Sequence, residues 1–220
     1  MKIISFCLWG NNPKYNIGAE RNIELAKEYY PGWICRFYCD NTISKSTEKI
    51  IIENDNCEMV KIESTGNWKF TVNRFLPMSE NIEYMISRDT DSRIGDREAS
   101  AVNEWINSGK SAHIMRDHPY HGGFPMLAGM FGIKGGVIKN VKALLNLYQN
   151  TEQYHYDQVF LKDFIYPFIE DDVVVHDDFF EKKPFPKRRD GLNFVGQIYN
   201  SDETIIQEHQ VILKRELNNE

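Results

Sequence analysis

The sequence predicts an α/β fold with a mostly parallel central sheet covered by helices on both faces. Short apolar runs of strand length alternate with segments in which apolar residues recur at helical spacing. Turn-forming residues such as Gly10 and Pro31 separate these runs from the helices. Repeated alternation of strands and helices requires crossover connections, which place the strands of the sheet parallel to one another.

The first half of the chain contains four predicted strand–helix pairs. The first strand, residues 2–9, is an apolar run that ends at a Gly-Asn-Asn-Pro loop. Ala19, Ile23 and Ala26 recur at helical spacing after it, and the helix ends at Pro31. The same criteria predict strands at 33–39, 57–62 and 84–87, and helices at 44–54, 68–76 and 99–106.

The second half departs from this alternation. Residues 126–134 form a buried strand, in which Gly129 and Gly132 indicate close backbone approach. The other predicted elements are strands at 113–115 and 173–176, helices at 138–148, 156–168 and 205–217, and a basic, proline-rich loop at 179–190. No repeat or linker is evident, so we expect one domain over 1–220. The polar end, 216–220, is either a terminus or the beginning of a linker to further domains.

Composition limits the classes of partner. The chain carries 26 basic and 32 acidic side chains, and its net charge of −6 gives no bulk attraction to nucleic acid or anionic membranes. No run of eighteen apolar residues is present, so we expect no transmembrane segment. The four cysteines lie in apolar, strand-like stretches without a CxxC pair. They predict reduced thiols in a cytoplasmic protein, with disulfides as the alternative.

The loop after the fourth strand is the most informative. Ligands of open parallel sheets bind outside the carboxyl ends of the strands, which points to residues 9–18, 40–41, 66–74 and 88–93. Asp89 and Asp91 stand two residues apart in the last of these loops, and extended backbone would direct both carboxylates to one side. Such a pair can hold Mg²⁺ or Mn²⁺. The alternative is that the two residues only cap the next helix.

Other motifs for chemistry are incomplete. An EF-hand loop that began at Asp89 would need Gly and Glu where the chain has Ile94 and Ser100. The first strand is followed neither by the Asp pair of a haloacid-dehalogenase-type phosphatase nor by the glycines of a nucleotide-binding loop. A trio of histidines lacks zinc-site spacing and a nearby cysteine, so core or loop positions are favoured for His113, His118 and His121.

Several segments, taken together, resemble a known family. These segments are the Leu-Trp loop at 8–9, the strand and acidic pair at 84–92, the Gly-Met-Phe-Gly stretch at 129–132, the Asp-Gln helix at 156–161 and the Val-His-Asp stretch at 174–178. They are similar to nucleotide-sugar glycosyltransferases of the GT-A fold. The combination is especially similar to small glycosyltransferase domains of large algal DNA viruses (chlorovirus type). The resemblance covers nearly the whole chain, and residues 116–121 depart from the general pattern.

This resemblance implies a reaction and a cofactor. The expected enzyme moves a hexosyl or deoxyhexosyl group from a UDP-sugar to a glycan or another hydroxyl acceptor. Mn²⁺, or alternatively Mg²⁺, would neutralise the departing diphosphate, with added charge from Arg74 or from the basic stretch 182–189. That stretch fits a solvated surface segment equally well. A metal-dependent phosphohydrolase and a nucleotide-sugar-binding module without turnover remain as alternatives.

The resemblance also assigns the metal ligands. Asp91 would bind the ion directly, and Asp89 would bind it through water or contact the donor ribose. His176, which follows the last short strand, would complete the site. The alternative for His176 is a surface pairing with Asp177 or Asp178.

The remaining assignments concern the donor and the chemistry. Leu8, Trp9 and Tyr15 would contact the nucleoside, unless Trp9 is a core residue. Arg74 would contact the ribose or the phosphates. Two carboxylates compete for the role of catalytic base in an inverting enzyme: Asp157, beside Gln158 at the donor sugar, and Asp117, which would otherwise hold sugar hydroxyls. In a retaining enzyme the leaving phosphate takes the proton, and the sequence leaves this choice open.

Overall fold

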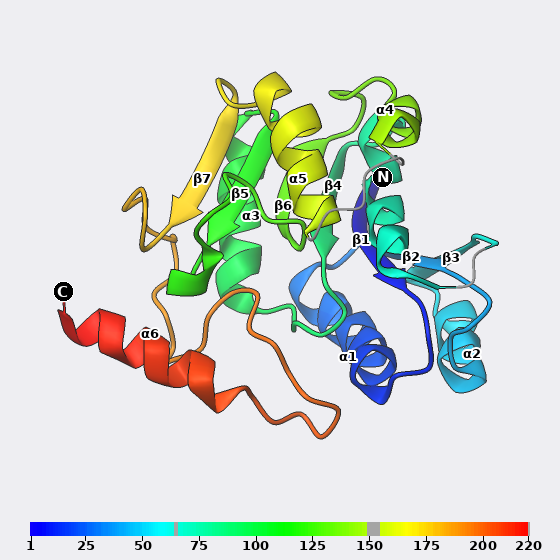
Figure 1. Ribbon diagram of the computed structural model, residues 1–220, viewed down its shortest axis with the longest axis horizontal. Helices are drawn as coiled ribbons and strands as arrows, with labels where there is room; N and C mark the ends of the chain where they lie inside the picture. The colour runs from blue at the N-terminus through cyan, green and yellow to red at the C-terminus, as the bar shows by residue number, and fades with distance from the viewer. Residues whose placement is uncertain (64–65, 149–154, 220) are drawn as a thin grey trace.

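The computed structural model describes residues 1–63, 66–148 and 155–219. Seven strands within these ranges form one sheet in the order β3-β2-β1-β4-β6-β5-β7 (Figure 1). Strand β6 (Met130–Lys134) is antiparallel to its neighbours β4 (Tyr84–Arg88) and β5 (Ala112–Arg116). The other pairings are parallel, which confirms the predicted mostly parallel α/β sheet.

Strand β1 (Lys2–Leu8) lies between β4 and β2 (Ile34–Cys39), and β3 (Cys57–Lys61) forms the edge beyond β2. In the parallel register of β1 and β4, Ser5 stands opposite Ser87. The two strands therefore end at the same side of the sheet. This register brings the loop after β1 and the acidic pair after β4 together.

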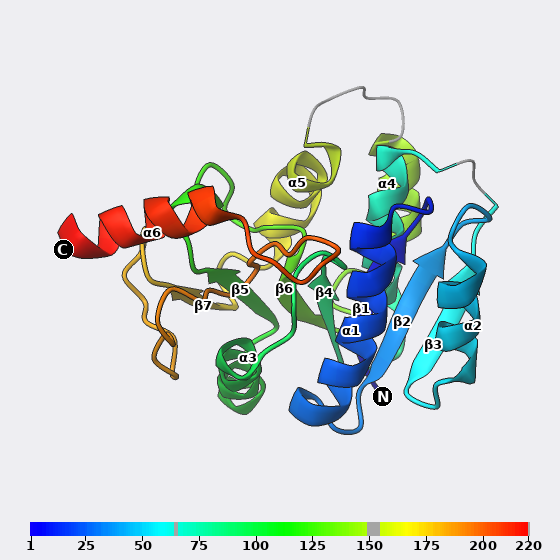
Figure 2. The ribbon, with the colours of Figure 1, turned by 90° about the horizontal axis from the view of Figure 1, so that it is seen from below.

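Helices cover both faces of the sheet, as Figure 2 shows with α4 and α5 above it and α3 below. One apolar core includes side chains of α1 (Pro13–Tyr29), α2 (Lys45–Glu53) and α3 (Asp96–Ser108). The other includes side chains of η1 (Trp68–Ser79), α4 (Val141–Tyr148) and α5 (Tyr156–Phe160). Both cores include fully buried aromatic side chains such as Phe37 and Phe131. Burial of this kind is the main stabilising contribution to the fold.

Local signals explain where the helices begin and end. The Asn12 side chain accepts a hydrogen bond from the backbone N–H of Lys14, and Pro13 occupies the first turn of α1. Ser44 caps α2 in the same way. Gly109 ends α3 at φ 74°, a left-handed conformation that favours glycine. The sequence patterns found these helices, although α1 begins earlier than its apolar stripe suggested.

Two predicted elements differ in detail. The helix expected over 156–168 changes from α5 to a π-helical turn, η3 (Leu161–Ile165), and then to a 3₁₀ turn, η4 (Tyr166–Phe168). The π-helical turn shifts the register, so Phe168 is exposed and does not extend the buried face of Phe160. The strand expected over 126–134 begins only at Met130, because the Met130 N–H bonds the Leu127 carbonyl in a turn.

Beyond β7 (Val173–Asp177), at the second edge of the sheet, the chain passes through the predicted basic loop to α6 (Gln207–Asn219). Helix α6 projects away from the sheet toward the C-terminus (Figures 1 and 2). It begins two residues later than predicted, because Ile205 forms an isolated bridge with Tyr199. Across the described helices, none combines the length and apolar character that a membrane span requires.

Candidate active site

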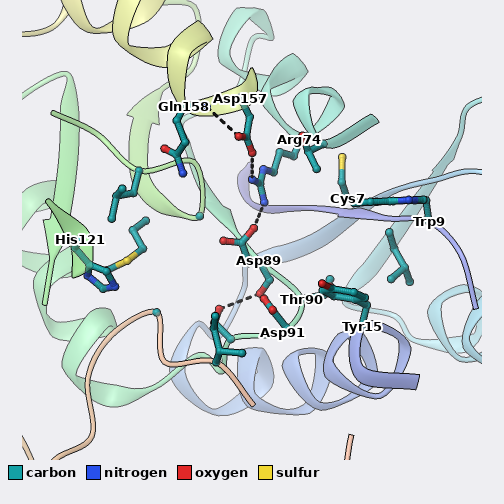
Figure 3. Close-up of a pocket in the computed structure, with 18 residues that line it drawn as sticks. Cys7, Trp9, Tyr15, Arg74, Asp89, Thr90, Asp91, His121, Asp157 and Gln158 are labelled. Carbon is teal, nitrogen blue, oxygen red and sulfur yellow. Dashed lines mark hydrogen bonds and ion pairs between the residues drawn. The ribbon is translucent and has the colours of Figure 1, made fainter. Parts of the chain in front are cut away.

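A pocket of about 390 Å³ lies at the carboxyl ends of β1 and β4. Figure 3 shows Trp9 and Tyr15 at one end of it, His121 at the other, and Asp89 between them. Most of the predicted site residues line this pocket: Leu8, Trp9, Tyr15, Arg74, Asp89, Asp91, Asp157 and Gln158. The fold therefore brings together residues that are up to 150 positions apart in sequence (158 − 8 = 150).

Arg74 joins two carboxylates in the middle of the pocket. Its Nη1 donates to Asp89 Oδ1, and its Nη2 donates to Asp157 Oδ2 at 2.9 Å. The guanidinium is buried, and burial alone would lower its pKa, but the charges of Asp89 and Asp157 outweigh this effect and raise it. A permanently charged Arg74 therefore links η1, the turn after β4 and helix α5.

The acidic pair is shaped by a turn. The N–H and the hydroxyl of Ser92 both donate to the Asp89 carbonyl, so the backbone bends where extended geometry was predicted. Both carboxylates nevertheless reach the pocket, and Asp91 Oδ2 lies 2.8 Å from Lys14 Nζ. Burial, reinforced by the charge of Asp89, raises the pKa of Asp91. A cation near the pair would relieve this cost.

The pair fits a divalent ion only in part. Among the described residues, no three His, Cys, Asp or Glu side chains are grouped closely enough to hold a metal ion. Carboxylate oxygens are the ligands that Mg²⁺ and Mn²⁺ prefer, and both ions also accept water and phosphate oxygens. Asp89 and Asp91 are therefore suited to an ion whose remaining ligands come from water and a diphosphate.

Gln158 and Gly129 fix the backbone that faces the acidic pair. Gln158 Oε1 accepts a hydrogen bond from the N–H of Ala128 at 3.0 Å. A β-carbon added at Gly129 would lie 2.6 Å from Cγ of Asp89. The segment before β6 thus packs directly against the Asp89 carboxylate, which explains the small residue at this position.

The end of the pocket opposite to His121 is aromatic. The rings of Trp9 and Tyr15 are nearly parallel, with centroids 6.4 Å apart, and Phe70 packs against Trp9 from another side. Trp9 and Tyr15 are only partly buried, so their rings can contact a ligand, whereas Leu8 is fully buried. Behind Trp9, Asp40 Oδ2 is buried and has no hydrogen-bond partner among the described residues. An N–H donor from a ligand would satisfy such an oxygen.

No family model and no curated protein matches the chain. Solved structures do match, among them the galactosyltransferase LgtC in complex with donor and acceptor sugar analogues, at 13% identity. That match covers 81% of this chain and 74% of LgtC, with a TM-score of 0.52. The protein has the GT-A fold.

Two further glycosyltransferases share the fold. GlyE of Streptococcus pneumoniae TIGR4 matches at 14% identity and a TM-score of 0.53, over 80% of this chain and 45% of GlyE. S. aureus TarS 1-349 matches at 14% identity and a TM-score of 0.50, over 81% of this chain and 58% of that one. Identities this low establish the GT-A fold alone. The chain spans less than half the length of GlyE.

His176 lies outside the pocket of this GT-A fold, contrary to expectation. Strands β5 and β6 stand between β7 and β4, so the ring cannot reach the acidic pair. Its Nδ1 lies 2.8 Å from His113 Nε2, and its Nε2 lies 3.5 Å from Glu104. Burial lowers the pKa of His176 and also excludes the alternative surface pairing. We therefore no longer assign His176 to a metal site.

Asp117 is also absent from the pocket lining. Its buried carboxylate accepts two hydrogen bonds from Arg97 at 2.9 Å, one from Arg189 at 2.6 Å and one from the Val195 N–H at 2.8 Å. Arg189 and Val195 belong to the segment after β7, and Arg97 belongs to α3. Asp117 therefore joins that segment and α3 to the end of β5. The geometry gives Asp117 a structural position and leaves Asp157 as the pocket carboxylate near Arg74.

The basic stretch does not supply the pocket with charge. Lys187 pairs with Asp96, Arg189 pairs with Asp117, and neither lines the site. Arg74, which was predicted, lines the pocket, and Lys14, which was not, pairs with Asp91 beside it. Lys14 falls within the loop at 9–18, which the sequence analysis had already placed at the carboxyl end of a strand. Its presence near the site could therefore have been predicted.

His121 and Met130 are among the lining residues that the sequence analysis did not assign to the site. His121 had been considered only as part of a histidine trio, and the three rings do not share one site. His113 is buried beside His176, whereas His118 packs near His121 and contacts α6 through the His209 carbonyl. The long path from β5 to β6, which carries His121 to the pocket, has no sequence periodicity that would have revealed it.

Proposed function

We propose that this protein is a glycosyltransferase that moves a hexosyl or deoxyhexosyl group from a UDP-sugar to a glycan or another hydroxyl acceptor. The observation that supports it best is Arg74, which joins Asp89 of the acidic pair to Asp157 inside one pocket. The pocket thus has an aromatic end suited to a base, a charged centre suited to a diphosphate, and a further carboxylate beyond it. The GT-A fold adds support.

We also propose a divalent cofactor, Mn²⁺ or Mg²⁺, held by Asp91 directly and by Asp89 through water or at the donor ribose. When bound, the ion would neutralise negative charge on the departing UDP. Without an imidazole at the pair, the donor set gives no preference for Mn²⁺ over Mg²⁺. Lys14, which pairs with Asp91, and Arg74, which pairs with Asp89, would add positive charge at the acidic pair.

Trp9 and Tyr15 bind the nucleoside in this proposal, and Asp157 faces the sugar. In an inverting reaction Asp157 accepts the proton of the acceptor hydroxyl as the new bond forms. In a retaining reaction the leaving phosphate takes that proton, and Asp157 and Gln158 stabilise the positively charged sugar. Arg74 holds Asp157 in place under either stereochemistry.

The test uses a panel of UDP-sugars with Mn²⁺, Mg²⁺ or EDTA, and follows melting temperature and UDP release. Metal-dependent stabilisation by UDP, with slow UDP release from one sugar, is expected for the transferase. Release of inorganic phosphate would indicate the phosphohydrolase, and binding without product the non-catalytic module. Asp91→Ala should abolish metal-dependent UDP binding while the far-UV spectrum is unchanged.

Two finer proposals concern origin and compartment. We propose a relationship to the glycosyltransferase domains of algal viruses, on the resemblance of the sequence segments alone. We also propose a reducing compartment such as the cytoplasm, of the host if the protein is viral. The four cysteines, which lie in apolar stretches of the sequence without a CxxC pair, are the basis of this second proposal.

A further inference from the structure

His121 stands at the end of the pocket opposite to Trp9 and Tyr15 (Figure 3). It is the last residue of a short 3₁₀ turn, η2 (Pro119–His121). Its Nδ1 accepts a hydrogen bond from the backbone N–H of Asp117 at 3.0 Å. Because Nδ1 acts as an acceptor, the neutral ring must carry its proton on Nε2. The local backbone therefore selects one tautomer of His121.

The ring is also fixed in position. The centroids of His118 and Phe194 lie 5.7 and 5.9 Å from that of His121. Gly196 closes the other side, since a β-carbon there would lie 3.4 Å from Cε1 of His121 and 2.6 Å from Sδ of Met130. At φ 82°, Gly196 has a conformation that other residues rarely adopt. The imidazole is thus held before any ligand arrives.

Nε2 is a hydrogen-bond donor without an acceptor. No hydrogen bond from it to any of the described residues is present, although the ring lines the pocket. Met130 lies near the ring, since both contact the Cβ position of Gly196, and the pocket lining also includes the apolar Leu127 and Ile198. Burial, reinforced by nearby positive charge, lowers the pKa of His121 to about 3, so the ring stays neutral at ordinary pH. A single fixed N–H in apolar surroundings is suited to one hydroxyl of a ligand.

We propose that His121 is a specificity-determining residue, whose Nε2–H donates to one hydroxyl of the donor sugar. The proposal deepens the proposed function and rests on it. The nucleoside occupies the aromatic end, so the sugar extends past Asp89 toward His121. Direct metal ligation by Nε2 is disfavoured, because the proton would have to move to Nδ1 and would then oppose the Asp117 N–H. A hydroxyl at this point makes a hydrogen bond that an analogue lacking it leaves unmade.

The test compares two substitutions, one that keeps the hydrogen-bond acceptor at Nδ1 and one that keeps the donor at Nε2. In His121→Asn the amide oxygen can replace Nδ1 as acceptor for the Asp117 N–H, but no donor reaches the pocket. In His121→Gln the longer amide can replace the Nε2–H donor. Tyr120→Phe, on the same turn and absent from the pocket lining, is the matched control. Each variant is assayed with the best UDP-hexose of the panel and its monodeoxy analogues, by UDP release and by calorimetric binding.

Wild type should prefer the complete sugar over one monodeoxy analogue by about tenfold in kcat/KM, the size expected for one neutral hydrogen bond. His121→Asn should lose that preference, His121→Gln should keep part of it, and Tyr120→Phe should keep all of it. Metal-dependent binding of UDP itself should be the same in all four proteins. An unchanged preference in His121→Asn, or loss of its metal-dependent UDP binding, would overturn the proposal and leave the transferase assignment intact. Failure of wild type to bind any UDP-sugar would instead reject the proposed function.

Discussion

Gly129 and Asp89 are in such close contact that the carboxylate occupies the space where a β-carbon would stand. The contact connects the segment just before β6, a strand that is antiparallel to β4, with the acidic turn after β4. Only half of the Asp89 side chain is exposed, and its remaining freedom is limited by Arg74 and by the backbone at 129. Gly129, a residue with no side chain, therefore sets the orientation of Asp89 together with Arg74.

Gly129→Ala should displace Asp89 from its position against Arg74. Because the carboxylate is partly exposed, it can rotate toward solvent, so the loss of stability should be at most about 1–3 kcal/mol. Metal-dependent UDP binding should weaken at least tenfold, as measured by calorimetry with Mn²⁺ and with EDTA. Gly95→Ala is the control, because an added β-carbon there meets no atom within 4 Å. Unchanged UDP affinity in Gly129→Ala would show that Asp89 does not contribute to the nucleotide site.

Trp9→Ala should weaken UDP binding by about ten- to a hundredfold, since stacking of a base on an aromatic ring contributes about 1–3 kcal/mol. The Tyr15 ring remains as one wall, so some affinity should persist. Trp68→Ala is the matched control, since Trp68 is more exposed than Trp9 and does not line the pocket. Equal UDP affinity in Trp9→Ala and wild type would make Trp9 a packing residue for Phe70.

Much of the fold was predictable because its signals are local. Apolar runs, helical periodicity and stop residues such as Gly109 identified the strands and helices from short windows. The acidic pair was also found, since position at a strand end is a topological property. His176 was misplaced because its distance from Asp91 depends on strand order, and β6 enters the sheet between β4 and β5. Short sequence windows contain no information on that insertion.

The partners of Asp117 were equally inaccessible to sequence reasoning. Arg97 precedes it by 20 residues and Arg189 follows it by 72, and no periodicity connects the three. A buried carboxylate with four hydrogen bonds and a lone carboxylate at a catalytic centre look alike in sequence. The difference between structural and catalytic aspartate is made by tertiary packing.

Asp117→Asn should destabilise the protein without abolishing turnover. The amide cannot balance Arg97 and Arg189, and removing one charge from such a buried cluster costs on the order of 3 kcal/mol. Urea denaturation measures the loss, and UDP release at low temperature measures turnover. Asp96→Asn, an exposed partner of Lys187, should change stability by less than about 1 kcal/mol. Wild-type stability combined with lost turnover in Asp117→Asn would return Asp117 to the catalytic role.

Acid should destabilise the protein through its buried histidines. His113 is fully buried beside His176, and burial lowers its pKa well below the usual value near 6.5. The unfolded chain binds a proton as the pH falls below 6.5, but the native ring does not, so stability decreases with falling pH in that range. One such histidine contributes up to about 1.4 kcal/mol per pH unit.

His113→Phe should reduce this acid sensitivity. The aromatic substitute keeps a ring against Trp105, although it loses the contact of His113 with His176. The free energy of unfolding should therefore be lower at pH 7.5 but should fall less steeply toward pH 5. Urea titrations at several pH values measure the slope, and His176 keeps part of it. A slope identical to that of wild type would show that His113 is not buried in its neutral form.

Asp157→Asn should separate chemistry from nucleotide binding. Asp157 Oδ2 accepts from Arg74 at 2.9 Å, and Oδ1 accepts from the Gln158 N–H, so the carboxylate is directed by two elements. An asparagine keeps the shape but can neither accept a proton nor balance the Arg74 charge. Turnover should fall about a hundredfold or more, the usual contribution of a positioned base or charge, while the Kd for UDP changes only a few-fold.

The control for this substitution is Asp163→Asn, an exposed residue of the following π-helical turn, which should leave both quantities unchanged. A parallel loss of UDP affinity and turnover in Asp157→Asn would mean that Asp157 acts only by holding Arg74 at the diphosphate. Near wild-type turnover in Asp157→Asn, with an inactive Asp117→Asn of normal stability, would transfer the role to Asp117. Because Asp117 is enclosed by two arginines and a backbone N–H, whereas Asp157 lines the pocket, we expect the loss of turnover at Asp157.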